Sequence, residues 1–382
     1  MVYSPARYIG SIFCKKNPLH LTFFLTRRCN AQCPFCFYPV RKETSQVGQD
    51  KKNTEFSNGV NLSSGSTGTS DELTLEEIKK ISSSMGRLLW LAFSGGEIFL
   101  RSDLVEITRV FYEKNKPAII LLPTNGLMPD IIRGKIEAIL NHCGKSTVVV
   151  KLSLEGQEEL HDSIRGKGSF QKTMQTYNKL GELPEKYPNF ELGINTVFSS
   201  ANQDSMQSLI EDVNKMGNIK THTVSLIRGD VSDEGLKNID INKYRDTINT
   251  LASNLRNKRS NIYRFRGARL KAAQDILQRR LIYDTVLQNR QLLPCYAGRL
   301  NLVLTESGDV YPCESFTPEM KMGSIKDSGY NIKTLLKTGQ ARKIVKSIKD
   351  NSCFCTHECY VMTNILFNPR MYPALFREYL KL

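Results

Sequence analysis

Three cysteines lie close together near the start of the chain, as Cys29, Cys33 and Cys36 in the run LTRRCNAQCPFCF. Cysteine thiolates are the usual ligands of iron–sulfur clusters, and a [4Fe–4S] cube takes four ligands. Three thiolates would leave one iron with an open position that a substrate or cofactor can occupy. Close cysteines also occur in zinc sites, so the triplet alone leaves both kinds of metal centre open.

A second group of cysteines lies in the C-terminal part of the chain. It consists of Cys295, Cys313, Cys353, Cys355 and Cys359. Ten cysteines in a chain without a signal peptide predict metal ligands or catalytic thiols rather than disulfides. Zinc remains the alternative for this second group, because His357 lies among its cysteines. Cys14 and Cys143 stand apart and are predicted to be small buried hydrophobic residues.

The length and charge of the chain limit its class. A chain of 382 residues can form one large domain and a smaller one. The formal charge of +15 predicts a basic surface that favours anionic partners such as phosphorylated metabolites, acidic peptides or nucleic acid. No apolar run is long enough to cross a membrane, and no signal peptide is present, which together predict a cytoplasmic protein.

Short apolar runs alternate with amphipathic stretches over residues 21–230, which is typical of β/α units repeated around a parallel sheet. Six strands are predicted, at Leu21–Leu25, Leu88–Phe93, Ala118–Leu122, Thr147–Leu154, Phe190–Val197 and His222–Ile227. Thr74 and Glu77 have the spacing of a capping box that starts a helix before the second strand. The loops at the carboxyl edge of such a sheet are expected to carry the chemistry.

Four sequence motifs follow these strands in order. The cysteine triplet follows the first strand, Phe93-Ser94-Gly95-Gly96-Glu97 ends the second, and Pro123-Thr124-Asn125-Gly126 ends the third. The fourth strand ends in Ser153-Leu154-Glu155-Gly156, which is followed by Ile164-Arg165-Gly166. Together these motifs resemble the radical S-adenosylmethionine (SAM) superfamily. The chain departs from the family pattern at Ile98, where a proline is usual, and at Glu155, where aspartate is usual.

The resemblance implies a partial (β/α)6 TIM-like barrel and a [4Fe–4S] cluster whose open iron is chelated by SAM. In this family the reduced cluster cleaves SAM to a 5′-deoxyadenosyl radical, which takes a hydrogen atom from the substrate. The electron would come from an external donor of the flavodoxin or ferredoxin type. The resemblance places these residues around SAM: Phe35, Gly95, Gly96, Glu97, Asn125, Ser153, Arg165, Asn195 and Arg228.

The C-terminal cysteines resemble a SPASM or twitch extension. Cys295 and Cys313 flank a hairpin pattern, in which Val303-Leu304 and Val310-Tyr311 surround Glu306-Ser307-Gly308-Asp309. A full SPASM extension uses seven cysteines, so the five in this chain imply one auxiliary [4Fe–4S] cluster. Its ligands would be Cys295, Cys313 and two of the last three cysteines, with Cys359 preferred and the choice between Cys353 and Cys355 open. Candidate proton acceptors near it are His357, Glu358 and Tyr360.

Four segments are predicted along the chain. Residues 1–20 lead into the barrel at 21–230, a basic helical connector spans 231–290, and a small α+β cluster-binding domain spans 291–382. Residues 41–72 are rich in Ser, Gly, Asn, Thr and Lys, which predicts a disordered insertion, either an inert linker or a lid. The connector reads as a solvated basic face, although Tyr263 and Phe265 keep nucleic acid binding open.

The substrate is the least determined feature of the sequence. About 20 residues precede the first predicted strand, too few for a leader-peptide recognition module. That favours a small metabolite such as a sugar, an alcohol or a phosphorylated compound. A maturase of a ribosomally made peptide is the alternative, followed by an RNA-modifying enzyme. A cluster-bearing sensor without catalysis is opposed by the intact cysteine triplet and Glu97. The auxiliary cluster would serve either substrate oxidation or substrate binding.

Overall fold

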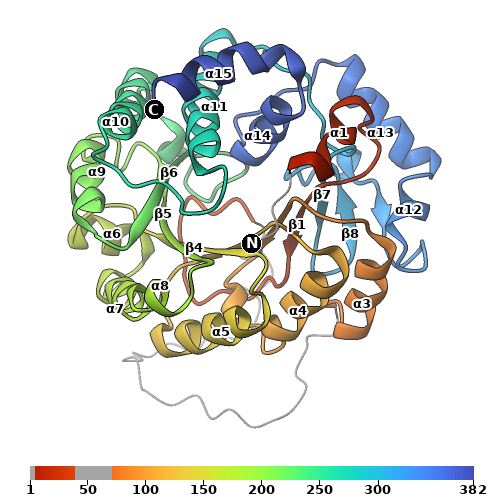
Figure 1. Cartoon of the computed structure of the whole chain (residues 1–382), viewed down its shortest axis with the longest axis horizontal. Helices are drawn as coiled ribbons and strands as arrows, with labels where there is room; N and C mark the ends of the chain where they lie inside the picture. Colours follow the sequence, from red (N-terminus) through yellow and green to blue (C-terminus); the bar gives the residue numbers. More distant parts are fainter. Residues whose placement is uncertain (1–4, 39–70) are drawn as a thin grey trace.

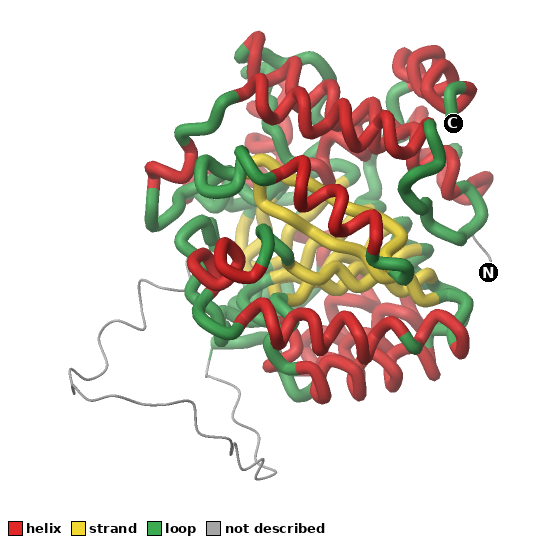
Figure 2. Tube along the Cα trace, turned by 90° about the vertical axis from the view of Figure 1, so that its left-hand side faces the viewer, coloured by secondary structure: helices red, strands yellow, loops and turns green. Residues whose placement is uncertain are grey.

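The structure is a computed structural model that describes residues 5–38 and 71–382. Within these residues the strands form one sheet in the order β6-β5-β4-β3-β2-β1-β7-β8-β9. Figure 1 shows the strands at the centre of the molecule with the helices arranged in a ring around them. The view turned by 90° shows the strands enclosed between helical layers (Figure 2). The predicted insertion at 41–72 lies outside the described residues except for its last two positions.

Six parallel strands form the barrel wall. They are β1 (His20–Phe24), β2 (Trp90–Ser94), β3 (Ile119–Thr124), β4 (Thr147–Ser153), β5 (Phe190–Phe198) and β6 (Ile219–Leu226). Every predicted strand is present, with its ends within three residues of the prediction. The largest difference is in β6, which begins before His222 because a bulge at Leu192 and Gly193 lets its pairing with β5 continue. The predicted fold class is confirmed.

Helices cover the outside of this wall. They are α3 (Leu75–Ser84), α4 (Leu104–Asn115), α5 (Pro129–His142), α6 (Glu158–Arg165), α7 (Ser169–Gly181), α8 (Leu183–Lys186) and α9 (Met206–Lys215). The capping box predicted at the start of α3 is present, because the Thr74 side chain accepts from the Glu77 N–H and the Glu77 side chain accepts from the Thr74 N–H. A short helix, α1 (Gly10–Phe13), precedes β1.

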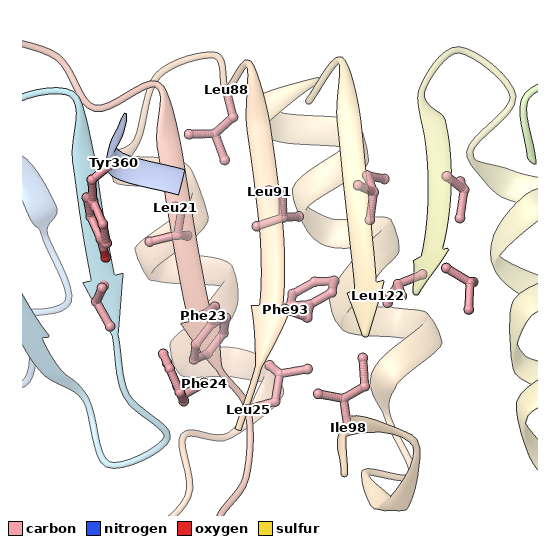
Figure 3. Close-up of a cluster of buried hydrophobic side chains, with 14 of the residues drawn as sticks. Leu21, Phe23, Phe24, Leu25, Leu88, Leu91, Phe93, Ile98, Leu122 and Tyr360 are labelled. Carbon is pink, nitrogen blue, oxygen red and sulfur yellow. The ribbon is translucent and has the colours of Figure 1, made fainter. Parts of the chain in front are cut away.

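Alternation along the strands separates an apolar outer face from an inner face that mixes polar and apolar side chains. Leu21 and Phe23 of β1 are fully buried, and Phe23 packs edge-on against Phe111 of α4 with ring centroids 6.1 Å apart. Figure 3 shows these side chains with Leu91 and Phe93 of β2 in the apolar layer next to the outer helices. Residues of opposite parity face the barrel interior. They include Thr22, Lys151, Ser153, Asn195, Thr223 and Ser225, which all line one cavity.

The C-terminal hairpin extends the barrel sheet. Its strands are β7 (Asn301–Leu304), β8 (Asp309–Tyr311) and β9 (Gly323–Ser324). β7 pairs in parallel with β1, and β8 pairs antiparallel with β7 in the predicted hairpin, with Val303 opposite Tyr311. The helices α12 (Ile332–Leu335) and α13 (Gly339–Asp350) follow. The predicted boundary at residue 291 therefore does not separate two sheets.

Four helices close the ring between β6 and β7 (Figure 1). They are α10 (Ile241–Arg256), α11 (Ala268–Gln288), α14 (Glu358–Leu366) and α15 (Tyr372–Leu380). α10 packs against α9 and α11, and α11 also contacts α14 and α15. Short 3₁₀ turns occur at Pro5–Tyr8, Ile98–Leu100, Glu234–Lys237, Pro318–Met320 and Pro369–Met371. Among the described helices, none is long and apolar enough to cross a membrane.

The structure corrects the prediction for Cys14 and the suggestion that Tyr263 and Phe265 bind nucleic acid. Cys143 is buried as predicted, whereas Cys14 is exposed because it follows the short N-terminal helix on the surface. Tyr263 and Phe265 are only 7% and 9% exposed, since they pack with Trp90 against the inner face of the barrel. Their rings are therefore not available to stack on nucleic acid bases, and the observation that kept that interpretation open is removed.

Candidate active site

Glycines at the end of β2 hold the loop that carries the cysteine triplet. The Gly96 N–H donates to Thr26 O at 2.8 Å, and the Glu97 N–H donates to Arg28 O at 2.8 Å. A Cβ atom at Gly96 would lie 2.0 Å from Arg28 O, and one at Gly95 would lie 2.4 Å from Thr26 O. Only glycine allows this approach, which places the backbone one residue before Cys29 directly against the end of β2.

Glu97 connects the ends of β2 and β3 beneath this loop. Its Oε2 accepts the Asn125 N–H at 2.8 Å, and its Oε1 accepts the Thr124 hydroxyl at 2.9 Å and the Phe99 N–H at 3.2 Å. Burial raises the pKa of Glu97 to about 7, and these donors act in the opposite direction. Because Oε2 accepts only one of these bonds, it retains acceptor capacity for an ammonium group.

Polar hydrogens point at the cysteine sulfurs. The Ala31 N–H donates to Cys29 Sγ at 3.4 Å, and Arg165 Nη1 donates to Cys33 Sγ at 3.4 Å. Burial raises the pKa of Cys29 to about 11, so the bare protein keeps a neutral thiol and metal binding must release a proton. N–H donors and a guanidinium favour the thiolate form, and the surroundings therefore fit a cluster ligated through Cys29, Cys33 and Cys36.

Arg165 is held by a buried ion pair that sequence reasoning did not assign. Its Nη2 lies 2.6 Å from Glu155 Oε1 and its Nε lies 3.0 Å from the same oxygen. Glu155 is fully buried and also accepts the Val197 N–H at 2.8 Å. Burial raises the pKa of Glu155 and Arg165 lowers it. Position 155 carries glutamate where aspartate is usual in the family, and this glutamate forms an ion pair with Arg165, whose guanidinium also contacts Cys33.

One cavity of about 370 Å³ connects the two groups of cysteines. Its lining includes every residue predicted to surround SAM, which are Phe35, Gly95, Gly96, Glu97, Asn125, Ser153, Arg165, Asn195 and Arg228. The three cysteines of the triplet line one part of it, and Cys359 lines another. Cys359 reaches this space from far along the sequence because β7 pairs with β1 and α14 contacts β7 through Thr363 and Asn301.

Arg228 belongs to a charged network at the C-terminal cysteines. Its Nη2 lies 3.2 Å from Glu314 Oε2, and its Nη1 lies 3.7 Å from Glu358 Oε2. His357 Nε2 lies 2.6 Å from the same Glu314 oxygen, while its Nδ1 accepts the Cys359 N–H at 3.1 Å. Despite its burial, the pKa of Glu314 is lowered to about 2 by His357 and Arg228, so the carboxylate stays charged.

Four of the five C-terminal thiols, Cys295, Cys313, Cys353 and Cys355, interact electrostatically, although no three ligating side chains among the described residues stand at metal-binding distances. Burial raises the pKa of Cys313 to about 12, with further contributions from Cys295 and Cys353. Burial also raises the pKa of Cys355, and Cys295 and Cys313 again contribute. Both Cys353 and Cys355 are therefore electrostatic neighbours of the first two thiols, which fits an auxiliary cluster. The choice between the two stays a prediction.

The comparison with protein families decides the class of this chain. The model of the radical SAM superfamily matches residues 23–230, which run from within β1 to just beyond β6. The chain belongs to the radical SAM superfamily. The interpretation of the sequence as such an enzyme with an extension of the SPASM or twitch type is confirmed. Its predicted cofactors, a [4Fe–4S] cluster with SAM and an auxiliary cluster, are those of this family type.

The chain matches several curated proteins over part of their length. The chain is 26% identical over 322 residues to the antilisterial bacteriocin subtilosin biosynthesis protein AlbA of Bacillus subtilis, covering 82% of this chain and 58% of AlbA. It is 31% identical over 168 residues to Fe-coproporphyrin III synthase of Methanosarcina barkeri, covering 41% and 35%. It is 25% identical over 198 residues to PqqA peptide cyclase of Bradyrhizobium diazoefficiens, covering 51% and 43%. The chain thus spans less than two thirds of the length of each.

A solved structure shares the fold of this radical SAM chain over nearly its whole length. Native anSMEcpe with bound AdoMet and Cp18Cys peptide aligns with a TM-score of 0.56 at 18% identity, covering 95% of this chain and 96% of that one. At this level of identity the likeness shows the fold alone. It extends beyond the barrel into the C-terminal region that carries the second group of cysteines.

The residues that line the cavity differ in part from those predicted from the sequence. Tyr360 is an electrostatic neighbour of Glu314, Cys313 and Cys359, but it is only 2% exposed and does not line the cavity. Burial raises its pKa well above 10, so its hydroxyl stays protonated. Glu314 and Lys151 line the cavity but were missed. Glu314 could have been predicted near the site because it directly follows Cys313 in the sequence. Lys151 gave no such indication, because a single lysine within an apolar strand suggests no role by itself.

Replacing Arg165 with methionine is expected to lower the free energy of unfolding by about 3–5 kcal/mol, because Glu155 is left buried without its partner. Urea unfolding of the metal-free protein, followed by circular dichroism, measures this change. The double variant Arg165→Met/Glu155→Gln should recover much of the loss, since it removes both charges. Equal stability of the single variant and the wild type would show that the ion pair contributes little.

Proposed function

We propose that this radical SAM enzyme modifies a peptide, abstracting a hydrogen atom from one residue beside an auxiliary cluster. The observation that carries the proposal is the single cavity lined by Cys29, Cys33 and Cys36 and by Cys359. A substrate group bound there is within reach of both metal-binding regions. A bound cluster and SAM would supply the radical that takes the hydrogen atom.

The comparisons favour a peptide over the small metabolite that the sequence suggested first. AlbA is a bacteriocin biosynthesis protein, PqqA peptide cyclase acts on a peptide, and anSMEcpe is solved with a peptide bound. Fe-coproporphyrin III synthase points the other way, but it covers only 41% of this chain. The RNA interpretation keeps only the basic charge of the connector as support, because Tyr263 and Phe265 are buried. The peptide alternative therefore becomes the proposal.

Residues of the barrel would position SAM. Glu97 offers an acceptor for its amino group, and Phe35 offers a ring face for its adenine, held in place by the Arg165 guanidinium 5.3 Å from the ring centroid. Ser153 and Asn195, paired across β4 and β5, present polar groups from the inner face. The cysteine triplet would ligate the cluster, and an external flavodoxin- or ferredoxin-type donor would supply the electron.

Residues around the second cysteine group would handle the substrate proton. His357 and Glu358 line the cavity beside Cys359. The Nδ1 atom of His357 accepts a backbone N–H, so its Nε2 faces Glu314. His357 could accept the substrate proton at Nδ1 by giving up the Cys359 N–H, and the Glu314 carboxylate would stabilise the imidazolium that forms. The auxiliary cluster would be held by Cys295, Cys313, Cys359 and one of the two remaining cysteines.

Replacing His357 with alanine is expected to lower the rate of peptide product formation by about 100-fold, a typical contribution of general acid–base catalysis. Formation of 5′-deoxyadenosine from SAM should continue, because the His357 side chain contacts Glu314 and the turn at Cys359, not the triplet. Liquid chromatography with mass spectrometry measures both products. His142→Ala, an exposed site at the end of α5, is the matched control. Undiminished product formation would remove the proposed role.

The proposed function is tested with peptides encoded next to the gene. Anaerobically reconstituted protein is incubated with SAM, dithionite and each synthetic peptide. A peptide mass change that appears together with 5′-deoxyadenosine, and that is absent in the Cys29→Ala variant, supports the proposal. Conversion of a small metabolite made by neighbouring biosynthetic enzymes, with every peptide left unchanged, would restore the first interpretation.

A further inference from the structure

A lysine lies inside the barrel on the wall of the cavity. Lys151 is the fifth residue of β4, it is only 6% exposed, and its side chain faces the same interior as Ser153. Its Nζ donates to Thr223 Oγ1 at 3.1 Å, to Thr221 O at 3.3 Å and to Thr221 Oγ1. All of these acceptors are neutral oxygens of β6. Among the described residues, no carboxylate lies within 4.0 Å of this ammonium group.

The position of the Lys151 ammonium group depends on Gly193 in β5, the strand between β4 and β6. Lys151 starts on β4 and reaches β6, so its side chain must cross β5. A Cβ atom at Gly193 of β5 would lie 2.6 Å from Lys151 Nζ and 2.8 Å from Thr221 O. Any side chain at position 193 would therefore occupy the path of Lys151. Three strands combine to place one cation at this point of the cavity.

The charges around this point leave a positive excess. Lys271, Asp275 and Arg279 face Lys151 from α11, and Glu191 faces it from β5. Asp275 is already paired with Lys271, and Glu191 accepts the Arg264 N–H at 2.7 Å. Burial lowers the pKa of Lys151 to about 7, with Asp275 acting against this and Lys271 and Arg279 adding to it. A negative group arriving in the cavity would stabilise the charged ammonium.

We propose that Lys151 binds a carboxylate of the substrate in the barrel cavity. The carboxylate belongs either to an acidic side chain or to the C-terminus of the peptide, so this inference rests on the proposed function. The hydroxyls of Thr221 and Thr223 orient the ammonium group, and Gly193 gives it room. A buried cation without a carboxylate partner costs stability, which fits a residue that serves binding.

The test measures the binding of small carboxylates to reconstituted, SAM-bound protein by anaerobic calorimetry. Four probes form two matched pairs. N-acetylglutamate N-methylamide and its glutamine analogue represent a side chain, and N-acetylglycine and N-acetylglycinamide represent a C-terminus. We expect one charged probe to bind at least about tenfold more tightly than its neutral partner, as a charge-assisted hydrogen bond provides. The pair that shows the preference identifies the source of the carboxylate.

Two variants decide whether Lys151 is responsible. Lys151→Met should remove the preference, and Gly193→Ala, which keeps the lysine but fills its path, should weaken it. Lys151→Met should also raise the thermal unfolding midpoint, whereas a lysine kept for structure alone would make it fall. Equal binding of charged and neutral probes to the wild type, or an unchanged preference in Lys151→Met, would overturn the inference. A clear preference without turnover of any peptide would contradict the proposed function and leave the subsite standing.

Discussion

Replacing Cys29, Cys33 and Cys36 together with alanine is expected to lower the iron content of the reconstituted protein from about eight atoms to about four. Acid-labile sulfide should fall in parallel. The reason is that the triplet and the C-terminal thiols lie in separate parts of the structure, so losing one set of ligands leaves the other intact. Burial raises the pKa of the bare Cys29 and Cys313 thiols, and a cluster forms only where several thiols converge.

The complementary variant locates the second cluster. Replacing Cys295 and Cys313 with alanine should also leave about four irons per chain, now those of the triplet. Cys14→Ala and Cys143→Ala should change nothing, because these cysteines stand apart from both groups. A wild type with about four irons that falls to zero in the triplet variant would mean that the C-terminal cysteines hold no iron–sulfur cluster. The enzyme would then manage its substrate radical with the barrel alone.

Replacing Gly96 with alanine is expected to remove the triplet's cluster without touching a cysteine. The new Cβ would lie 2.0 Å from Arg28 O and 2.6 Å from Arg28 C, which are backbone atoms that no side-chain rotation can move away. The loop must therefore shift immediately before Cys29, and the three sulfurs lose their common geometry. Iron content should fall toward about four, and 5′-deoxyadenosine formation should fall with it.

The matched control for this change is Gly86→Ala. Gly86 lies in the exposed loop before β2, and a Cβ atom there meets no other atom within 4 Å. This variant should keep about eight irons and normal formation of 5′-deoxyadenosine. Full iron content in Gly96→Ala would show that the loop tolerates the shift, and that the paired glycines serve a purpose other than close approach to the triplet.

The barrel could be predicted from the sequence because its signals are local. Each apolar run between turn residues corresponds to one strand, and the capping box at Thr74 starts the helix that was predicted. The motifs at the strand ends could be placed for the same reason, since parallel strands bring their carboxyl ends to one edge. Residues as distant as Cys29, Glu97 and Arg165 thus meet in one cavity.

The C-terminal part was predicted less completely because its contacts are long-range. The hairpin around Gly308 is a local pattern and is present, but its pairing with β1 has no local signal. The same holds for Tyr360, which the sequence made a candidate proton acceptor near the auxiliary cluster and which packing keeps off the cavity wall. A helix side chain next to a ligand in the sequence can face either way, and the tertiary contacts of α14 decide which.

The sequence by itself determined the superfamily, the order of the strands and the two groups of thiols, because spacing along the chain encodes each of them. Only the tertiary structure decided that the triplet and Cys359 share one cavity and that Glu314 pairs with His357 and Arg228. It also decided that Lys151 crosses Gly193 to reach β6. Which polar groups end up as neighbours depends on how separate strands and helices pack, and no local pattern records that packing.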